Sequence, residues 1–437
     1  ILQISLRFQR IIDLINGIWD VVNDVLFGAI VDKTRTRWGK FKPYLVALGI
    51  PGTIGTCLFW LLPLFFHGSS SENILKFIVY LLLAVVREGA GTFRGIAQNG
   101  IRATITPHPV DRTRLITIAD FVSGALGEKL PEQIMTVMLD LISRDKINIS
   151  YEKMFVGMGL FTAIVAGAGA LWFFLICKER VMQSVETPSV KASIKSIINN
   201  KPILLMTLSQ ILGSFAVGGS KQDYYIDVLN FASLGLITGI PGAIINPFSY
   251  MAVPWFRRHF SSRFLYIIGN KIDGILLVPV FLVGCIGGKK HGLYKNIWVM
   301  GIAMMLWETI FMIFYGVRRI IPTEMYNEAM DYCEWKNGYR TEGMTSVAQG
   351  LASKLASIFS RYISNYIKQL IGYDLTRYVR GTAQTDETKF GLFAMFTIVP
   401  FLTGMISIIP MLFYDLSGKK KEKMYEELLE RRAAMSK

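Results

Sequence analysis

Cysteine, histidine and charge are all scarce in this sequence of 437 residues. The four cysteines have no paired spacing, so neither a disulfide framework nor a zinc site is indicated. The four histidines form no ligand cluster, and no catalytic triad or nucleotide-binding loop is present. The sequence therefore gives no support to an enzyme activity, and it predicts no cofactor.

Apolar residues are abundant instead. They make up 52% of the chain, charged residues make up only 18%, and the mean hydropathy is +0.39. Apolar runs of about 20 residues match the hydrocarbon thickness of a bilayer. We therefore predict an all-α polytopic membrane protein. The eleven predicted spans are 4–31, 44–66, 74–98, 113–140, 153–177, 202–229, 236–256, 264–286, 294–321, 344–371 and 389–414.

The net charge of +15 comes mostly from Lys and Arg in alternate loops. This alternation follows the positive-inside rule, so we expect these loops and the C-terminus in the cytoplasm of a multi-pass cell-membrane protein. The basic charge thus indicates contact with a lipid bilayer and not with nucleic acid. Eleven spans with the basic tail inside place residue 1 outside at the start of a span, so we expect a preceding first helix.

A polar stretch after the fifth predicted span divides the chain. We predict an N-terminal helix bundle at 1–177 and a cytoplasmic linker with an interfacial helix at 178–201. A C-terminal bundle at 202–418 and a basic cytoplasmic tail at 419–437 follow.

The first span contains two carboxylates and an amide. Asp20, Asn23 and Asp24 are spaced i, i+3 and i+4, so they share one face of a helix. A carboxylate at membrane depth is costly unless it is paired, protonated or bound to a cation, and two adjacent carboxylates repel each other. The spacing predicts a site for a proton or a small metal ion in a transporter.

Three motifs extend this interpretation: Trp19-Asp20-x-x-Asn23-Asp24, Gly28 to Pro43, and Asp331 to Gly343. Together they resemble the glycoside–pentoside–hexuronide:cation symporters, the melibiose permease-like family of the major facilitator superfamily. The resemblance implies two six-helix bundles, the first helix being absent from this chain, and alternating access by a monomer. It also implies symport of a sugar, glycoside or uronide with Na+, Li+ or H+.

The same resemblance implies the cation ligands, which are Asp20, Asn23, Asp24 and Thr92 in this chain. All are hard oxygen donors that suit Na+ or Li+ if the ion is not H+. Lys354 matches a lysine near the cation and solute sites. An alternative is that Lys354 neutralises a purely structural carboxylate pair.

The solute side departs from the family pattern. Gly95 and Asn99 replace a sugar-binding aspartate and an aromatic residue, and Asp120 replaces an arginine. One hypothesis is that Arg94 pairs with Asp120 and restores the lost charges; otherwise both extend to the membrane interface. The alternatives in function are symport of a non-sugar amphiphile or organic ion, and a transport-inactive sensor or scaffold.

Charged residues after the second family helix and in the second half resemble the superfamily motifs that link helix ends in one conformational state. The alternative is that they only set the orientation in the membrane. The predicted gating residues are Asp32, Arg35, Arg37, Lys40, Asp331, Glu334, Arg340 and Glu342.

Overall fold

The computed structural model forms two compact units. The first unit comprises Ile1–Thr187 with Asp374–Ala383, and the second comprises Pro188–Tyr373 with Gln384–Lys437. The predicted domain boundaries stay predictions, and most of the predicted linker lies outside the described residues. The structure describes residues 2–33, 36, 38–39, 41–47, 49–104, 115, 118–119, 122–123, 127, 129–177, 195, 198–337, 342–374, 383–416 and 418–435.

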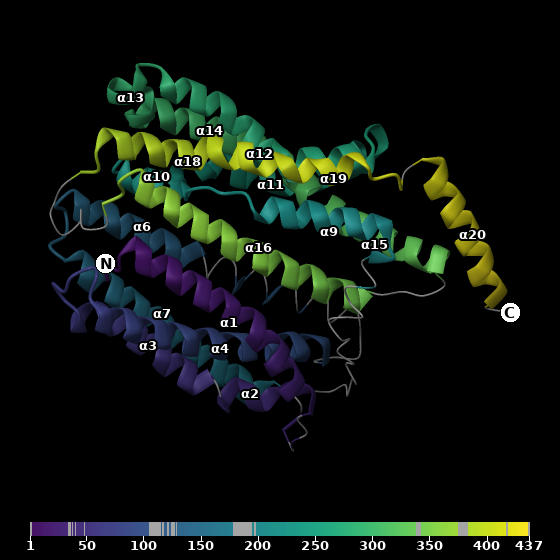
Figure 1. Ribbon diagram of the computed structural model, residues 1–437, viewed down its shortest axis with the longest axis horizontal. Helices are drawn as coiled ribbons and strands as arrows, with labels where there is room; N and C mark the ends of the chain where they lie inside the picture. Colours follow the sequence, from purple (N-terminus) through teal and green to yellow (C-terminus); the bar gives the residue numbers. More distant parts are fainter. Residues whose placement is uncertain are drawn as a thin grey trace. The chain divides into compact units, whose positions relative to one another are not determined.

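The described secondary structure of the first unit is helical. Its helices pack as neighbours, with α1 and α3 on α4 and with α3 on α7 (Figure 1). The helices are α1 (Leu6–Lys33), α2 (Lys42–Ala47), α3 (Gly49–Phe65), α4 (Ile74–Thr104), α6 (Leu130–Ser143) and α7 (Tyr151–Ile176).

The second unit is helical as well in its described part. Here α11 packs on α14 and α15, and α12 packs on α14, α15 and α18 (Figure 1). The longer helices are α9 (Lys201–Ser214), α11 (Leu234–His259), α12 (Ser262–Cys285), α14 (Ile297–Ile313), α15 (Tyr315–Asn337), α16 (Glu342–Leu370), α18 (Asp386–Gly404) and α20 (Lys419–Met435). The short ones are α10 (Lys221–Asp227), α13 (Gly288–His291), η2 (Leu293–Lys295), η3 (Met405–Ser407) and α19 (Ile408–Leu412).

Six segments among the described residues are long and apolar enough to cross a membrane. They are Lys42–Phe65, Tyr151–Ile176, Leu234–His259, Ser262–Cys285, Ile297–Lys336 and Asp386–Leu412. The helices α1, α4 and α16 have 28, 31 and 29 residues, but each contains several charged side chains. Charged side chains inside a membrane avoid lipid, so they face other helices or a water-filled cavity. The polar faces of these three helices are therefore expected to point away from lipid.

The predicted span 202–229 is wrong as a single helix, because the helix breaks after α9 and resumes at α10. Backbone groups freed by the break are satisfied by neighbouring helices. The Val217 N–H donates to Thr403 Oγ1 at 3.0 Å, and the Ser360 hydroxyl donates to the Ala216 carbonyl at 2.6 Å. A side chain at Gly218 would lie 2.6 Å from Pro400, so only glycine permits this close approach.

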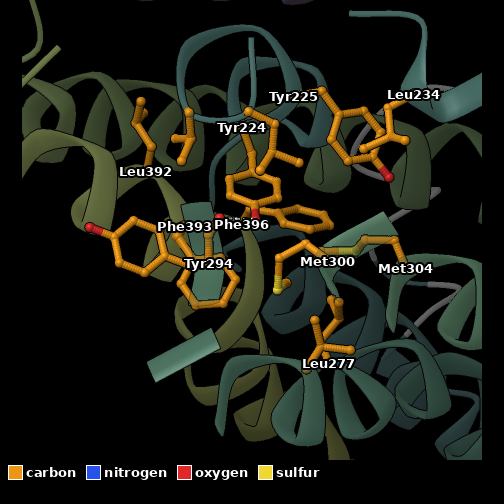
Figure 2. Packing of buried hydrophobic residues seen from close by; sticks show 13 residues of the cluster. Tyr224, Tyr225, Leu234, Leu277, Tyr294, Met300, Met304, Leu392, Phe393 and Phe396 are labelled. Atoms are coloured by element: carbon orange, nitrogen blue, oxygen red, sulfur yellow. Dashed lines mark hydrogen bonds between the residues drawn. The ribbon is translucent and has the colours of Figure 1, made fainter. Parts of the chain in front are cut away.

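Two apolar clusters fill the second unit. The first surrounds the rings of Tyr224, Tyr294 and Phe393, whose ring centroids are 5.4 Å apart for both tyrosine–phenylalanine pairs (Figure 2). The second includes Leu265 and Val317. Because lipid is as apolar as these side chains, the clusters stabilise the unit mainly through close packing.

The helix that contains Asp331 is longer than predicted. α15 continues to Asn337, well beyond the expected end of the span at 321, and carries the acidic motif on a helix. The predicted basic tail is largely the helix α20, which packs on α15 beyond the end of α19 (Figure 1). The apolar residues Met424 and Leu428 of α20, which are 0% and 1% exposed, join the second cluster.

Candidate functional site

Three side chains on one face of α1 have buried polar atoms without hydrogen-bond partners among the described residues. Asn23 is 0% exposed, and neither Oδ1 nor Nδ2 has a partner among the described residues. Asn16 Oδ1 and Trp19 Nε1 are in the same state. Leaving a buried polar group unsatisfied costs about 1–3 kcal/mol. This face therefore has free capacity to bind a ligand.

Helix α4 packs against this face of α1. A side chain at Gly89 would lie 3.5 Å from Phe27 Cε2 and 3.6 Å from Trp19 Nε1, so glycine lets the two helices approach. Phe27 then stacks on Phe93, with ring centroids 3.7 Å apart. Asn23 stands on α1 between Trp19 and Phe27 in helical register, so it lies at the packed junction with α4.

The predicted cation ligands are thus partly located. Asp20 is half-buried one turn before Asn23, and Thr92 is half-buried on α4 directly before Phe93. The side chain of Asp24 lies outside the described part of the structure. The two predicted helices do pack together, whereas coordination by the four residues stays a prediction. An amide oxygen, a carboxylate and a hydroxyl are the donor types that a small hard cation prefers.

Arg94 lines a polar cavity of about 280 Å³ inside the first unit. Arg87 also lines it, with its guanidinium over the ring of Phe59 at 4.2 Å from the centroid. Thr53 and Thr56 of α3 add hydroxyl groups to the wall. Arg87 falls inside the predicted span 74–98, but the sequence does not predict this cavity, because its wall joins helices far apart in the chain.

The remaining predicted solute residues are placed less fully. Gly95 is half-buried on α4, and a Cβ atom there would meet no other atom within 4 Å, so the backbone borders open space. Asp120 lies outside the described residues, as does the side chain of Asn99, and the Arg94–Asp120 pair stays a hypothesis. Lys354 is half-buried on α16 in the second unit, whereas Asp20 is in the first, so their predicted proximity also stays a prediction.

Asp331, one of the predicted gating residues of the second half, lies beside α20. The Tyr425 hydroxyl donates to Asp331 Oδ2 at 3.4 Å, and the Trp335 indole N–H donates to Glu427 Oε2 at 2.6 Å. Lys421 forms an ion pair with Glu328. Burial, with Asp331 and Glu328 nearby, raises the pKa of Tyr425 to about 12. α20 is therefore fastened to the acidic end of α15.

Sequence reasoning missed the basic partner of this acidic end. Arg257, at the end of α11, pairs with Glu324 and lies 3.5 Å from Glu328 Oε1. The i, i+4 spacing of the two glutamates is the signal that could have indicated a common partner. Asp415 contacts Lys201 at 3.1 Å and Lys420 at 2.9 Å. Burial alone raises the pKa of Asp415, but the hydrogen bonds from these two lysines keep it below the ordinary value.

Several predicted gating residues cannot be placed. Glu334 is half-buried on α15. The side chains of Asp32 and Glu342 are not described, and Arg35, Arg37, Lys40 and Arg340 lie outside the described residues. A network between these groups stays a prediction.

The helical spans, the buried polar face of α1 and the polar cavity define an all-α membrane transport protein. The chain belongs to the family described as MFS/sugar transport protein, which matches residues 1–418. This membership confirms the predicted major facilitator fold and the assignment as a transporter rather than an enzyme.

Several relatives are similar over nearly the whole chain. A glucuronide carrier protein homolog of Escherichia coli is 25% identical over 95% of this chain and 86% of its own length. An isoprimeverose transporter of Lactiplantibacillus pentosus is 24% identical over 96% of this chain and 83% of its own length. The inner membrane symporter YicJ of Escherichia coli is 25% identical over 94% of this chain and 84% of its own length.

Proposed function

We propose that this protein carries a sugar, glycoside or uronide across the cell membrane together with Na+, Li+ or H+, by alternating access. Family membership and relatives named as glucuronide, isoprimeverose and symport proteins support the solute class. The observation that carries the cation assignment is the buried, unsatisfied Asn23 amide, on the α1 face that includes Asp20 and packs on α4.

In this proposal the α1 face binds the cation and thereby favours solute binding. A cation satisfies the Asn23 oxygen and offsets repulsion between Asp20 and Asp24, which otherwise disfavours the packed α1–α4 junction. If both ligands stabilise the same state, each raises the affinity for the other by an equal factor. The basic loops and the α20 end of the second unit then face the cytoplasm.

Thermal unfolding of the purified protein tests the cation site. In Na+ or Li+ at about 100 times Kd, binding to the folded state should add about 2.7 kcal/mol of stability and raise Tm, whereas K+ at the same ionic strength should not. Asn23→Ala and Asp24→Asn should each abolish the ion-specific rise. If the ion is H+, the rise should instead follow pH and be lost in Asp24→Asn.

The matched control is Asp145→Asn, which changes an exposed loop carboxylate of the same unit. Its φ of 52° is a conformation that asparagine adopts readily, so the variant should fold and keep the ion-specific rise. An equal response to K+, or a full response in both α1 variants, would remove the proposed site. Solute affinity measured with and without the active ion then identifies the solute among glycosides and uronides.

A second candidate is symport of an organic anion, which the two arginines in the cavity of the first unit favour. Competition separates the two solute classes. A neutral glycoside or a uronide should displace the bound solute if the first proposal holds, and only carboxylate-bearing or sulfonated compounds without a sugar ring should do so under the second.

A further inference from the structure

Four ionisable side chains meet inside the second unit, next to the break between α9 and α10. Lys221 Nζ lies 3.1 Å from Glu308 Oε2, and Arg318 Nη1 lies 3.8 Å from Asp273 Oδ2. The first pair is close enough to act electrostatically on Asp273. The four residues come from α10, α12, α14 and α15, so folding of the unit creates this charged layer.

The charged layer lies between the two apolar clusters. Leu277, one turn after Asp273, and Met304, one turn before Glu308, belong to the cluster drawn in Figure 2. Leu265 and Val317, which is next to Arg318, belong to the other cluster. Ionised groups in such surroundings are costly, and in membrane proteins they mark ion or substrate pathways more often than stabilising contacts.

The neighbouring helix is shaped to accept Glu308. A side chain at Gly239 of α11 would lie 3.3 Å from Glu308 Oε1, and one at Gly242 would lie 3.5 Å from Glu308 Cγ. Lys221 Nζ also lies 5.5 Å from the centre of the Trp307 ring. Glu308 is therefore firmly held by a hydrogen-bonded cation on one side and a glycine surface on the other.

Asp273 is held much less firmly. Its separation from Arg318 exceeds hydrogen-bond distance, and its Oδ1 is buried without a partner among the described residues. The other nearby cation, Lys271, donates instead to the Gly404 carbonyl at 2.6 Å. A carboxylate oxygen in this state has room and capacity to bind a proton.

A polar cavity borders Arg318, the partner of Asp273. It has a volume of about 270 Å³, and Arg318, Lys271, Asn270 and Gln210 are part of its wall. A second hollow shares Gln210 and Asn270 and extends to Tyr326, two turns further along α15. About 10–15 Å³ suffices for one water molecule, so an aqueous path can reach Arg318 from the α20 end of the unit.

We propose that Asp273 is a second cation site of this transporter, specific for a proton, and that Arg318 and the proton compete for its carboxylate. Asp273 Oδ1 takes one proton from a hydronium ion in the cavity, and the hydronium ion becomes water. This proton transfer neutralises Asp273 and releases Arg318 toward the cavity. The proposal goes beyond the α1 site and does not depend on it.

The charge around Asp273 fixes the direction of the pH dependence. The positive charges of Arg318 and Lys221 favour an ionised Asp273, whereas the negative charge of Glu308 and the burial of Asp273 Oδ1 favour a protonated one. The helices α18 from residue 390 onward and α19, which also pack on α12, contain no ionisable side chain. Removing Arg318 should therefore shift protonation of Asp273 to higher pH.

Infrared difference spectroscopy of the full-length protein between high and low pH tests this directly. A band of a protonated carboxyl group should appear as the pH falls, vanish in Asp273→Asn, and persist in Asp145→Asn. In Arg318→Gln the midpoint of the same band should rise by about 1–3 pH units. Asn23→Ala should leave the band unchanged, which separates this site from the one on α1.

Three outcomes would overturn the proposal. They are an unchanged band in Asp273→Asn, an unmoved midpoint in Arg318→Gln, and a pH midpoint that shifts with Na+ concentration at constant ionic strength. The last would assign the carboxylate to a metal ion. The spectrum is recorded without solute, so it is informative even if no sugar is transported.

Discussion

At the scale of single residues, glycine sets the closest helix contacts in the second unit. Gly316 of α15 lies so near α11 that a Cβ atom there would be 2.5 Å from the Ser249 carbonyl oxygen. The Gly316 N–H also takes part in this contact, because it donates to Ser249 Oγ at 3.0 Å. Since the obstacle is backbone, a side-chain rearrangement cannot relieve it.

Gly316→Ala should therefore destabilise the protein by about 1–3 kcal/mol, the usual range for overpacking. Gly301→Ala is the matched control, because its Cβ would meet only Leu234 Cδ1, at an ordinary 3.6 Å. It should be neutral, or stabilising by up to about 1 kcal/mol through helix propensity. Thermal unfolding of both variants in the same detergent measures the difference; equal Tm values would contradict the proposed close contact.

Residues also differ in how far sequence could predict their role. The location of Asn23 on one helix face with two acids was predictable, because it is a local pattern of one helix, whereas its role as a cation ligand stays a prediction. Asp273, Glu308 and Arg318 were not, since their pairing depends on which helices pack together. The sequence does place these charges inside apolar spans, and that is the signal that could have identified them.

At the scale of elements, α20 depends on apolar contacts made by a few buried side chains. Leu428 is 1% exposed within a cluster that includes Tyr332 and Tyr414. The polar contacts to Asp331 and Trp335 are partly exposed, and such contacts add little, about 0–1 kcal/mol each, whereas Glu328 is buried and its partner Lys421 is partly exposed. Burial of Leu428 and its neighbours should dominate docking.

Leu428→Ser should release α20 from α15, because it removes buried apolar contacts and buries a hydroxyl group. Limited proteolysis should then cut near residue 418 roughly ten times faster than in the wild-type protein, as expected for a loss of at least about 1.4 kcal/mol. Glu422→Ser, on the exposed side of the same helix, should keep the wild-type rate. Equal cleavage of all three proteins would show that α20 is not docked on α15 in the purified protein.

The sequence predicted the helix boundaries well where they depend on hydrophobicity alone. It predicted them less well where they depend on contacts with specific residues of other helices. Most spans begin and end near the expected residues because apolar length reflects the bilayer. The break at 215–220 was missed, since it depends on hydroxyl groups of Ser360, Ser364 and Thr403 from other helices. The docking of α20 was missed because its apolar residues alternate with many charges.

At the scale of the whole molecule, the loops of the second unit should alternate across the membrane. The 24 residues of α12 extend for roughly 36 Å at about 1.5 Å per residue, more than the hydrocarbon core of about 30 Å. Arg263 and Lys289, which lie near opposite ends of this helix, are therefore expected on opposite sides of the bilayer.

Labelling of single cysteines with a membrane-impermeant reagent checks this orientation. In sealed right-side-out vesicles Lys289→Cys should react and Glu422→Cys should not, and the pattern should reverse in inverted vesicles. The four native cysteines are buried or half-buried and are first replaced by serine. Reaction of Glu422→Cys from outside would contradict the cytoplasmic position proposed for α20.

The docking of α20 also has a consequence for biosynthesis. Glu328 and its partner Lys421 are separated by 93 residues, so α15 leaves the ribosome long before α20 exists. Until α20 has been synthesised, Glu328, Asp331 and the rings of Tyr332 and Trp335 lack the helix that covers them. A chain that stops before α20 keeps this mixed acidic and aromatic surface uncovered. Proteins that expose such a surface are degraded by quality-control proteases. Synthesis of α20 is thus expected to protect the chain from this degradation.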